Sequence, residues 1–243
     1  MAVPRARAAV AAELLPDTVA VSVIIPVLNE ADCLNQNLTR LFALPFVAEH
    51  CEVIVSDGGS EDDSLEIARR HGCRIVHSVA GRAMQMNRGA ELADGRQLLF
   101  LHADSCLPPD LHEHFPLDSE WGFFRLHLDH QASIFRVIET AVNLRSRITR
   151  IAGGDQGLFF SRAFFERLGA FPAIPLMEDI AICKAARRKL APAIVGSAIS
   201  SSSRRWLERG ILRTILLMWS LRLAYWLGVD PARLHRFYYP QRG

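Results

Sequence analysis

Two short acidic loops, each directly after an apolar run, hold the residues best placed to do chemistry. Asp57 follows the run at residues 51–55, and Asp104 follows the run at residues 97–101. Each carboxylate stands where a buried parallel strand would end, and ligands of open α/β sheets collect at that edge. Two carboxylates on one edge predict a site for a sugar–phosphate ligand and its metal ion.

The two acidic loops suggest different roles for their carboxylates. Glycines beside Asp57 let a ligand approach the backbone, so this side chain could bind a base or a ribose; it could equally cap its own turn. Asp104 alone is enough for Mg²⁺ or Mn²⁺ that also binds phosphate oxygens. His102, taken by itself, is more typical of a hydrogen-bonded core histidine.

Other polar segments stand at predicted helix ends and turns. Arg82 opens a helix after Gly81, where free N–H groups and a guanidinium together suit a diphosphate. Glu178 and Asp179 open another helix, and they either serve its dipole or supply a general base. The loop at 153–156 either binds hydroxyls or forms a plain turn, and the loop at 201–206 either closes over a diphosphate or caps the last helix.

The elements that must position these residues alternate between strands and helices in the first half. Strands are expected at 20–25, 52–55, 74–77 and 97–101, and helices at 29–44, 60–72 (with Ser60 as its cap) and 81–92. This alternation implies βαβ units and a parallel sheet.

The second half has a different rhythm. Strands are expected at 121–128 (with one solvent-facing side), 157–161, 193–195 and 198–201, and helices at 133–148, 162–168, 178–189 and 206–227. The fold class is therefore α/β, with a single mostly parallel sheet flanked by helices and a C-terminal helical tail. We expect a flexible segment at 1–18, a domain at 19–205 with halves at about 19–107 and 108–205, and a helix and tail at 206–243.

Composition limits the class of protein and its surroundings. The chain has 243 residues, 50% of them hydrophobic, so we expect a sizeable core. Its net charge of +2 argues neither for nor against nucleic acid, and we expect no nucleic-acid partner. Five scattered cysteines without CxxC spacing indicate a cytoplasmic location. The apolar stretch 211–229 is interrupted by Arg213 and Arg222, which favours an interfacial helix on the cytoplasmic face of a membrane over a spanning one.

Five segments, taken in order, resemble the family 2 inverting glycosyltransferases of the GT-A fold. They are VSVIIPVLNE (21–30), VIVSDGGSEDDS (53–64), GRAMQMNRGA (81–90), LLFLHADS (98–105) and PLMEDI (175–180). The combination of GGDQGLFFSR, MEDI and SSRRW is similar to a bacterial subgroup called radical-SAM/selenodomain-associated transferase 2, which is linked by name to arsenosugar biosynthesis. The resemblance implies a Rossmann-like GT-A sheet and a nucleoside diphosphate sugar, usually UDP-linked, as donor.

The resemblance also implies roles for single residues. Asp179 would be the catalytic base, with Glu178 as its neighbour and alternative, and a divalent cation, Mn²⁺ or Mg²⁺, would bind Asp104 and His102. The nucleotide would contact Pro26, Asn29, Glu30, Asp57, Arg82, Asn87, His102 and Ala103. The diphosphate or the acceptor would contact Asp155, Gln156, Arg204, Arg205 and Trp206.

Two departures from the family pattern affect the expected site. The acidic DxD motif is here His102-Ala103-Asp104, so its first carboxylate is missing, and SSRRW lacks the family's glutamine. The implied reaction is a single displacement that inverts the anomeric carbon, with a hydroxyl or carboxyl acceptor. That acceptor could be lipid-like, a carotenoid acid, a small metabolite or another sugar.

Three other classes of function compete with this interpretation. A sugar-phosphate nucleotidyltransferase has a related fold, but its glycine-rich loop and downstream lysine do not follow the first strand. A dehydrogenase would carry GxGxxG where this chain has Pro26 to Asn29. A non-catalytic, membrane-associated module that binds a nucleotide sugar is the third alternative, and the apolar tail motivates it.

Overall fold

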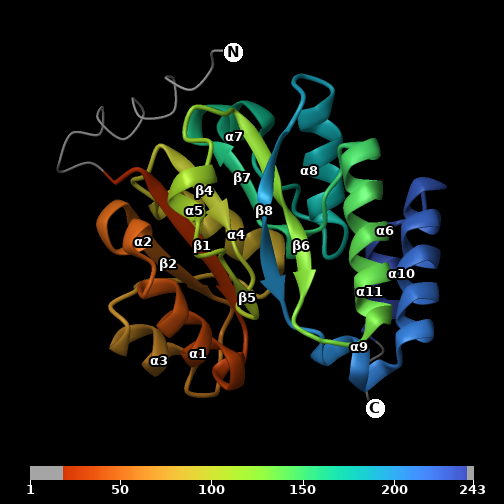
Figure 1. Cartoon of the computed structure of the whole chain (residues 1–243), viewed down its shortest axis with the longest axis horizontal. Coiled ribbons are helices and arrows are strands. Elements are labelled where there is room, and N and C mark those ends of the chain that lie inside the picture. The colour runs from red at the N-terminus through yellow and green to blue at the C-terminus, as the bar shows by residue number, and fades with distance from the viewer. Residues whose placement is uncertain (1–18, 240–243) are drawn as a thin grey trace, which may run out of the picture.

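A single mixed sheet organises the chain. The computed structural model describes residues 19–239, apart from the side chains of Arg205 and Arg209. Within these residues, eight strands form one sheet in the order β3-β2-β1-β4-β7-β6-β8-β5 (Figure 1). All strands except β7 and β5 run in the same direction, so the predicted mostly parallel sheet is confirmed. The expected flexible segment 1–18 lies outside the described residues.

The first half of the chain builds the parallel side of the sheet. Its strands are β1 (Val21–Val27), β2 (Cys51–Asp57), β3 (Arg74–His77) and β4 (Gln97–Phe100). Its helices are α1 (Ala31–Phe42), α2 (Pro45–His50), α3 (Ser64–Arg70) and α4 (Arg82–Leu92). The register pairs Asp57 with both Val27 and His77, so the first acidic loop lies at an edge shared by three strands.

The second half extends the sheet beyond β4. Its strands are β5 (Ser105–Cys106), β6 (Trp121–Leu128), β7 (Leu158–Ser161) and β8 (Ala193–Ser201). Its helices are α5 (Leu111–His114), α6 (Ser133–Thr149), α7 (Arg162–Leu168), α8 (Glu178–Arg187), α9 (Arg204–Arg209), α10 (Ile211–Trp226) and α11 (Pro231–Tyr238), with a 3₁₀ turn, η2, at Gly154–Gln156. Strand β7 is antiparallel to both β4 and β6 and joins the two halves.

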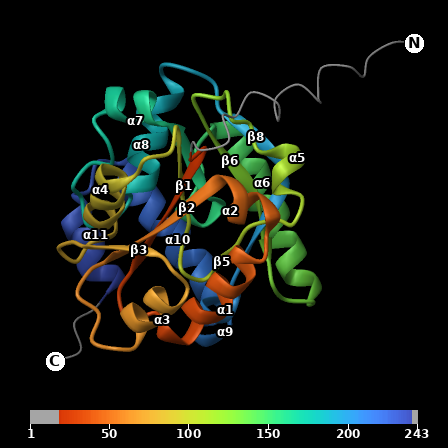
Figure 2. The same ribbon diagram turned by 90° about the vertical axis from the view of Figure 1, so that its left-hand side faces the viewer.

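Helices cover both faces of the sheet (Figures 1 and 2). One core cluster holds apolar side chains of α1, α2, α3 and α5, and a second holds those of α4, α7 and α8. A third packs Phe135 and Ile138 of α6 against Leu126 and Leu128 of β6. Helix α6 packs on the side of β6 that carries Leu126 and Leu128. On the side expected to face solvent, Arg125 is exposed and His127 is half-buried, but Phe123 is buried in the second cluster, so that expectation holds only in part.

The helix expected from Ser60 begins four residues later, at Ser64. Side-chain hydrogen bonds hold the intervening residues as a loop against the start of α1. Asp62 accepts from the backbone N–H groups of Ala31 (2.9 Å) and Ser64 (3.0 Å), and Asn29 accepts from that of Glu61 (2.8 Å). These contacts satisfy the polar groups that the predicted helical cap would have used.

The last part of the chain differs from the expected single long helix. Gly210, at φ 83°, separates α9 from α10, and a third helix, α11, follows. The two short strands expected at 193–195 and 198–201 form one strand, β8, with an irregularity opposite Phe124 and Arg125. The predicted helical C-terminal part is confirmed, and no helix within residues 19–239 is long and apolar enough to cross a membrane.

Candidate active site

A cleft of about 600 Å³ opens beside the sheet, between α6, α8 and α10. Its polar end collects charged and titratable residues of five separate segments of the chain. These residues are Arg82, His102, Asp104, Arg145, Asp155, Glu178 and Asp179. All except Arg145 were predicted as site residues, so the structure brings the second acidic loop, the start of α4, η2 and the start of α8 together.

The first turn of α8 places two carboxylates at this end of the cleft. Met177, just before the helix, has a left-handed backbone (φ 70°), and Glu178 and Asp179 follow as its first residues. The Asp179 carboxylate accepts a hydrogen bond from the backbone N–H of Gly154 in η2, at 2.8 Å. Asp179 is half-buried and lines the cleft, so one fixed carboxylate faces the space that a ligand would fill.

Glu178 has a different environment, because its side chain is almost fully buried. Its Oε1 lies 3.6 Å from Nε of Arg82, which comes from the start of α4. Burial and, to a smaller extent, the neighbouring Asp179 together raise the pKa of Glu178 to about 7, although Arg82 opposes both effects. Burial lowers the pKa of Arg82, but Glu178, Asp179 and two tyrosines of the C-terminal part together outweigh that effect and raise the pKa, so Arg82 stays charged. The structure thus gives Arg82 a carboxylate partner besides any ligand.

Arg145 of α6 is a candidate that the sequence did not single out. It donates to the hydroxyl of Ser146 at 2.8 Å, and among the described residues no acceptor reaches its buried Nε. Burial lowers its pKa, and Asp155 and Asp179 oppose that effect. The signal in the sequence is its position: Arg145 follows Ile138 and Val142 at helical spacing, on a face that is otherwise apolar.

Asp155 shares this environment with Arg145. Burial raises the pKa of Asp155, Arg145 opposes that effect, and the carboxylates of Asp179 and Asp104 add to it. Gly153 allows the close packing here, because a Cβ atom on it would stand 2.5 Å from Oδ1 of Asp155. Three carboxylates therefore lie near one another, with Arg145 as the cation among them.

The groups at the second acidic loop fit a cation that a ligand helps to hold. Within residues 19–239, no group of three or more His, Cys, Asp or Glu side chains could hold a metal ion. Mg²⁺ commonly takes one or two carboxylates and completes its shell with phosphate oxygens, which Asp104 in the cleft suits. His102 packs against η2, since a Cβ atom on Gly154 would lie 2.6 Å from its Nε2.

The first acidic loop is built as a self-capped turn. Asp57 accepts from the backbone N–H groups of Gly59 and Ser60, each at 3.0 Å, and its Oδ2 lies 3.5 Å from Nδ1 of His77. Burial favours a higher pKa for Asp57, but the hydrogen bonds from Ser60, Gly59 and His77 outweigh it and lower the pKa. Asp57 and the residues beside it are outside the lining of the cleft.

Several predicted nucleotide contacts have structural partners within the protein. The Asn87 amide donates to the carbonyl of Phe171 and accepts from its N–H, and so ties α4 to the segment before α8. The buried carbonyl of Ala103 accepts from Asn37. Near the first loop, Asn29 (φ 55°) donates its N–H to Ser60 and Glu30 donates its N–H to Ser64, beside Pro26 at the end of β1.

The residues predicted to contact the acceptor or the diphosphate also differ in where they lie. Gln156 is fully buried and accepts from Ser146 while it donates to the carbonyl of Phe124, so it is part of the scaffold. Trp206 of α9 lines the cleft. Arg204 is exposed, 3.8 Å from Glu208, and the side chain of Arg205 lies outside the described part of the structure.

Comparisons with known proteins agree with this architecture. Residues 22–116 match the family model described as Glycosyl transferase family 2. The chain is 32% identical over 106 residues to the Escherichia coli K12 "Uncharacterized glycosyltransferase YibD", covering 41% of this chain and 30% of that protein. It is 34% identical over 99 residues to the "Undecaprenyl-phosphate 4-deoxy-4-formamido-L-arabinose transferase" of Edwardsiella ictaluri, covering 37% and 30%. The chain spans about a third of the length of these relatives.

Solved structures share the fold over more of the chain. The mannosyltransferase PcManGT of Pyrobaculum calidifontis, in complex with GDP-Man and Mn²⁺, superposes with a TM-score of 0.61 at 20% identity, covering 95% of this chain and 68% of that one. TarS 1–349 of S. aureus, in complex with UDP-GlcNAc, superposes with a TM-score of 0.60 at 19% identity, covering 75% and 58%. Residues 22–116 therefore match the family 2 glycosyltransferases in sequence, and the sheet shares the GT-A fold of these solved structures.

Proposed function

We propose that this chain is an inverting glycosyltransferase that moves a sugar from a nucleoside diphosphate sugar, UDP-linked, to a hydroxyl or carboxyl acceptor. One observation carries the proposal. Asp179 is held by the Gly154 N–H at the polar end of a cleft that also contains Arg82 and Asp104. A fixed carboxylate facing that space is what a general base requires. Assignment to the arsenosugar-linked subgroup is part of the same proposal.

The reaction is a single displacement. Asp179 takes the proton of the acceptor hydroxyl while the acceptor oxygen attacks the anomeric carbon. The bond from that carbon to the diphosphate oxygen breaks, the electron pair leaves with the diphosphate, and the configuration at carbon inverts. Arg82, at the start of α4, stabilises the charge on the leaving group.

A divalent cation, Mn²⁺ or Mg²⁺, belongs to this proposal. Asp104 would hold it together with the phosphate oxygens of the donor, and His102 is its second candidate contact. When bound, such an ion neutralises the negative charge of the diphosphate. Two structural neighbours, PcManGT and the glucosyl-3-phosphoglycerate synthase of Mycobacterium tuberculosis, were solved in complex with Mn²⁺, which supports testing this ion first.

Glu178 is the alternative base, but its surroundings suit it less. It is more deeply buried than Asp179, and its carboxylate faces Arg82. We assign it to holding Arg82 in place. The nucleoside would lie at the ends of β1 and β2, near Asp57, Asn29 and Glu30, where glycines leave room for close approach.

A thermal-shift panel tests donor binding directly. UDP-, GDP- and dTDP-sugars are added with Mn²⁺, with Mg²⁺ or with a chelator, and the unfolding midpoint is measured. A ligand at 100 times its Kd stabilises a protein by about 2.7 kcal/mol, so the true donor should stand out. Asp104→Asn should lose the part of the shift that depends on the metal. If no nucleotide sugar shifts the midpoint with either ion, the proposal fails.

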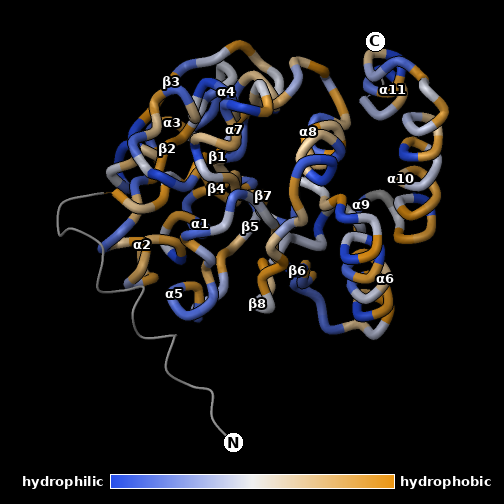
Figure 3. Tube along the Cα trace, turned by 90° about the horizontal axis from the view of Figure 1, so that it is seen from above, coloured by the Kyte–Doolittle hydropathy of each residue, from blue (hydrophilic) through white to orange (hydrophobic). Residues whose placement is uncertain are grey.

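Contact with a membrane surface is the last part of the proposed function. Helix α10 exposes a row of large apolar side chains, with Arg213 and Arg222 among them. Figure 3 shows hydrophobic segments along this helix at the edge of the molecule. Such a surface suits peripheral binding at the cytoplasmic face of a membrane.

A further inference from the structure

The cleft has two ends of opposite character. Its polar end holds the carboxylates described above. Its other end lies between α6 and α10, where Val137, Ile138 and Val142 face Ile215 and Trp219. The two ends belong to one continuous cavity of about 600 Å³, so a molecule bound in the apolar part reaches Asp179.

The apolar end is too hydrophobic for the donor. A sugar nucleotide needs hydrogen-bonding partners along its length, and a buried polar group without one is costly. The walls contributed here by α6 and α10 are mainly aliphatic and aromatic. A chain of methylene groups fits such walls, because each buried CH₂ group is favourable.

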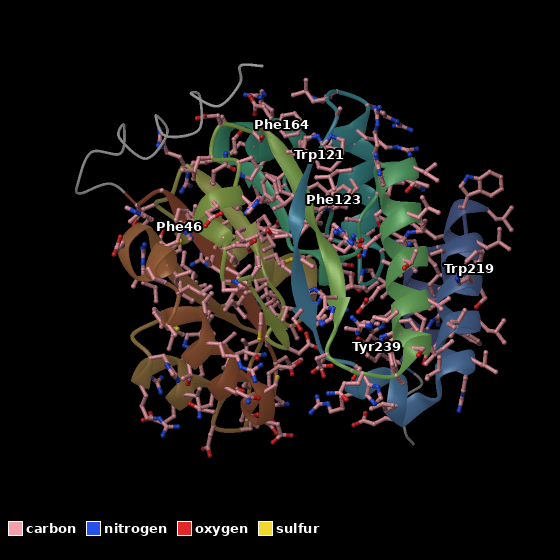
Figure 4. The ribbon with its side chains drawn as sticks, viewed as in Figure 1. Phe46, Trp121, Phe123, Phe164, Trp219 and Tyr239 are labelled. Carbon is pink, nitrogen blue, oxygen red and sulfur yellow. The ribbon has the colours of Figure 1, made fainter. Side chains whose placement is uncertain are left out.

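The apolar walls also continue to the outer surface. Val137 is 63% exposed and Trp219 is 73% exposed, and both line the cleft. Figure 4 labels Trp219 on α10 at the outer edge of the molecule. Contiguous exposed apolar surface of this kind marks a binding groove or an interaction site on a soluble protein. Its continuity with the carboxylates makes a binding groove for the reacting molecule the better interpretation.

We infer that the apolar end of the cleft, between α6 and α10, binds the chain of the acceptor, so that the acceptor is an amphiphile with a long apolar chain and a terminal oxygen nucleophile. The chain lies against Val137, Ile138 and Val142, and the terminal oxygen reaches Asp179. That oxygen forms the new bond to the anomeric carbon, its proton passes to Asp179, and the nucleoside diphosphate departs. This inference rests on the proposed function.

The first test measures binding without any donor. Trp206 and Trp219 line the cleft, and a bromine atom quenches tryptophan fluorescence on contact. Titration with 12-bromododecanol should give saturable quenching in the native protein and weaker quenching in Trp219→Phe. Ala141→Glu places a charge on an exposed position of the lining and should abolish saturation. The matched control Leu144→Glu changes an exposed residue of the same helix that is outside the lining, and should quench as the native protein does.

The second test measures transfer to acceptors of increasing chain length. Butanol, octanol and dodecanol are offered with the donor identified by thermal shift, and dodecyl phosphate distinguishes a phosphate head from a hydroxyl. The KM should fall by up to roughly fourfold per methylene in the native protein and in Leu144→Glu. In Ala141→Glu the chain-length dependence should disappear, while slow hydrolysis of the donor continues. Val137→Gln provides a second variant if Ala141→Glu folds poorly.

The outcomes separate the inference from the function on which it rests. Transfer to the alcohols with a KM that is indifferent to chain length overturns the inference and leaves sugar transfer intact. Equal quenching in the native protein and in Ala141→Glu also overturns it. Saturable quenching without any donor binding would instead sink the proposed glycosyltransfer and leave an amphiphile-binding cleft.

Discussion

At the level of single residues, the start of α8 gives two adjacent carboxylates different surroundings. Asp179 is half-buried and fixed by a backbone N–H, whereas Glu178 is buried beside Arg82 and its pKa is raised. Neighbouring titratable groups that have different surroundings commonly have different roles. We therefore test Asp179 through the rate of sugar transfer and Glu178 through the stability of the folded chain.

Asp179→Asn should lose transfer and keep donor binding. The asparagine carbonyl can still accept the Gly154 hydrogen bond, so the loop should hold its place. Loss of a general base lowers the rate by about 10²–10⁴-fold. Product formation measures the rate, and the thermal shift with donor measures binding. Native-like turnover in this variant would contradict the assignment of the base.

Glu178 should make the protein less stable as the pH rises. Its pKa is about 7 in the folded chain against an ordinary value of 4.5, so between these pH values the folded chain binds a proton that the unfolded chain lacks. Its contribution is therefore greatest below about pH 4.5, and it is lost as the pH rises to about 7. At about 1.4 kcal/mol per pKa unit, the loss is at most about 3 kcal/mol.

The comparison with Glu178→Gln isolates this effect. Urea unfolding at pH 5 and at pH 8 gives the change in unfolding free energy for each protein. The native protein should lose more stability over this interval than the variant, which has no proton to lose there. Parallel pH profiles would show that the Glu178 carboxyl is not responsible.

At the level of elements, the sheet depends on a close approach of two strands. Gly122 of β6 lies opposite Ala193 of β8, and a Cβ atom on it would overlap the Ala193 carbonyl and stand 2.5 Å from the ring of Phe159. The β6–β8 pairing is central to the second half of the sheet. A side chain at this position must push the strands apart.

Gly122→Ala should destabilise the fold, whereas Gly196→Ala should not. Overpacking of a core costs about 1–3 kcal/mol, and backbone atoms in the way favour the upper end of that range. Gly196 lies on β8 with open space around its Cβ position, which makes it a matched control. Thermal unfolding of both variants provides the measurement. Equal unfolding midpoints would mean that β6 and β8 can move apart with little loss of stability.

The strands and helices show how much of the fold could be predicted from the sequence. Continuous apolar runs predicted β1, β2 and β4 well, because such runs have few alternatives in a parallel sheet. The start of α3 was misplaced because Asp62 bonds to Ala31, a contact between segments distant in the sequence. The break at Gly210 and the burial of Phe123 in β6 likewise depend on how helices pack, which the local sequence pattern does not contain.

The same limit applies to the candidate site. Asp104, Arg82 and Asp179 could be predicted because motif position places them at strand and helix ends, and the structure brings them to one cleft. Arg145 was missed because its role depends on where α6 packs. Asn87 has the motif position of a ligand contact, but it serves as a tie between α4 and Phe171.

At the scale of the whole molecule, the apolar surface lies on one side. The helices α6 and α10, which carry these exposed residues, lie at the edge of the molecule that is far from β3 (Figure 3). Leu212 and Trp226 of α10 are 74% and 72% exposed, and neither lines the cleft. They therefore report on surface contact separately from acceptor binding.

The full chain should float with vesicles of phosphatidylcholine and phosphatidylglycerol in a density gradient. Replacing both Leu212 and Trp226 with Glu should reduce the floated fraction severalfold, because it removes apolar anchors and adds charge repelled by the anionic lipid. Val79→Glu, at a residue 71% exposed on the loop before α4, is the control and should float as the native chain does. Equal flotation of all three proteins would rule out α10 as the contact.

The place of β7 between β4 and β6 has a consequence for how the protein is made. The strands β1 to β4 are complete once the ribosome has passed Phe100, but the strand that covers β4 begins only at Leu158, 58 residues later. At synthesis rates of 5–20 residues per second, the outer edge of β4 waits about 3–12 s for its neighbour. During that interval the nascent chain presents an open strand edge of the kind that invites pairing with other chains. A translation pause between these two strands should therefore raise aggregation more than a pause after β7.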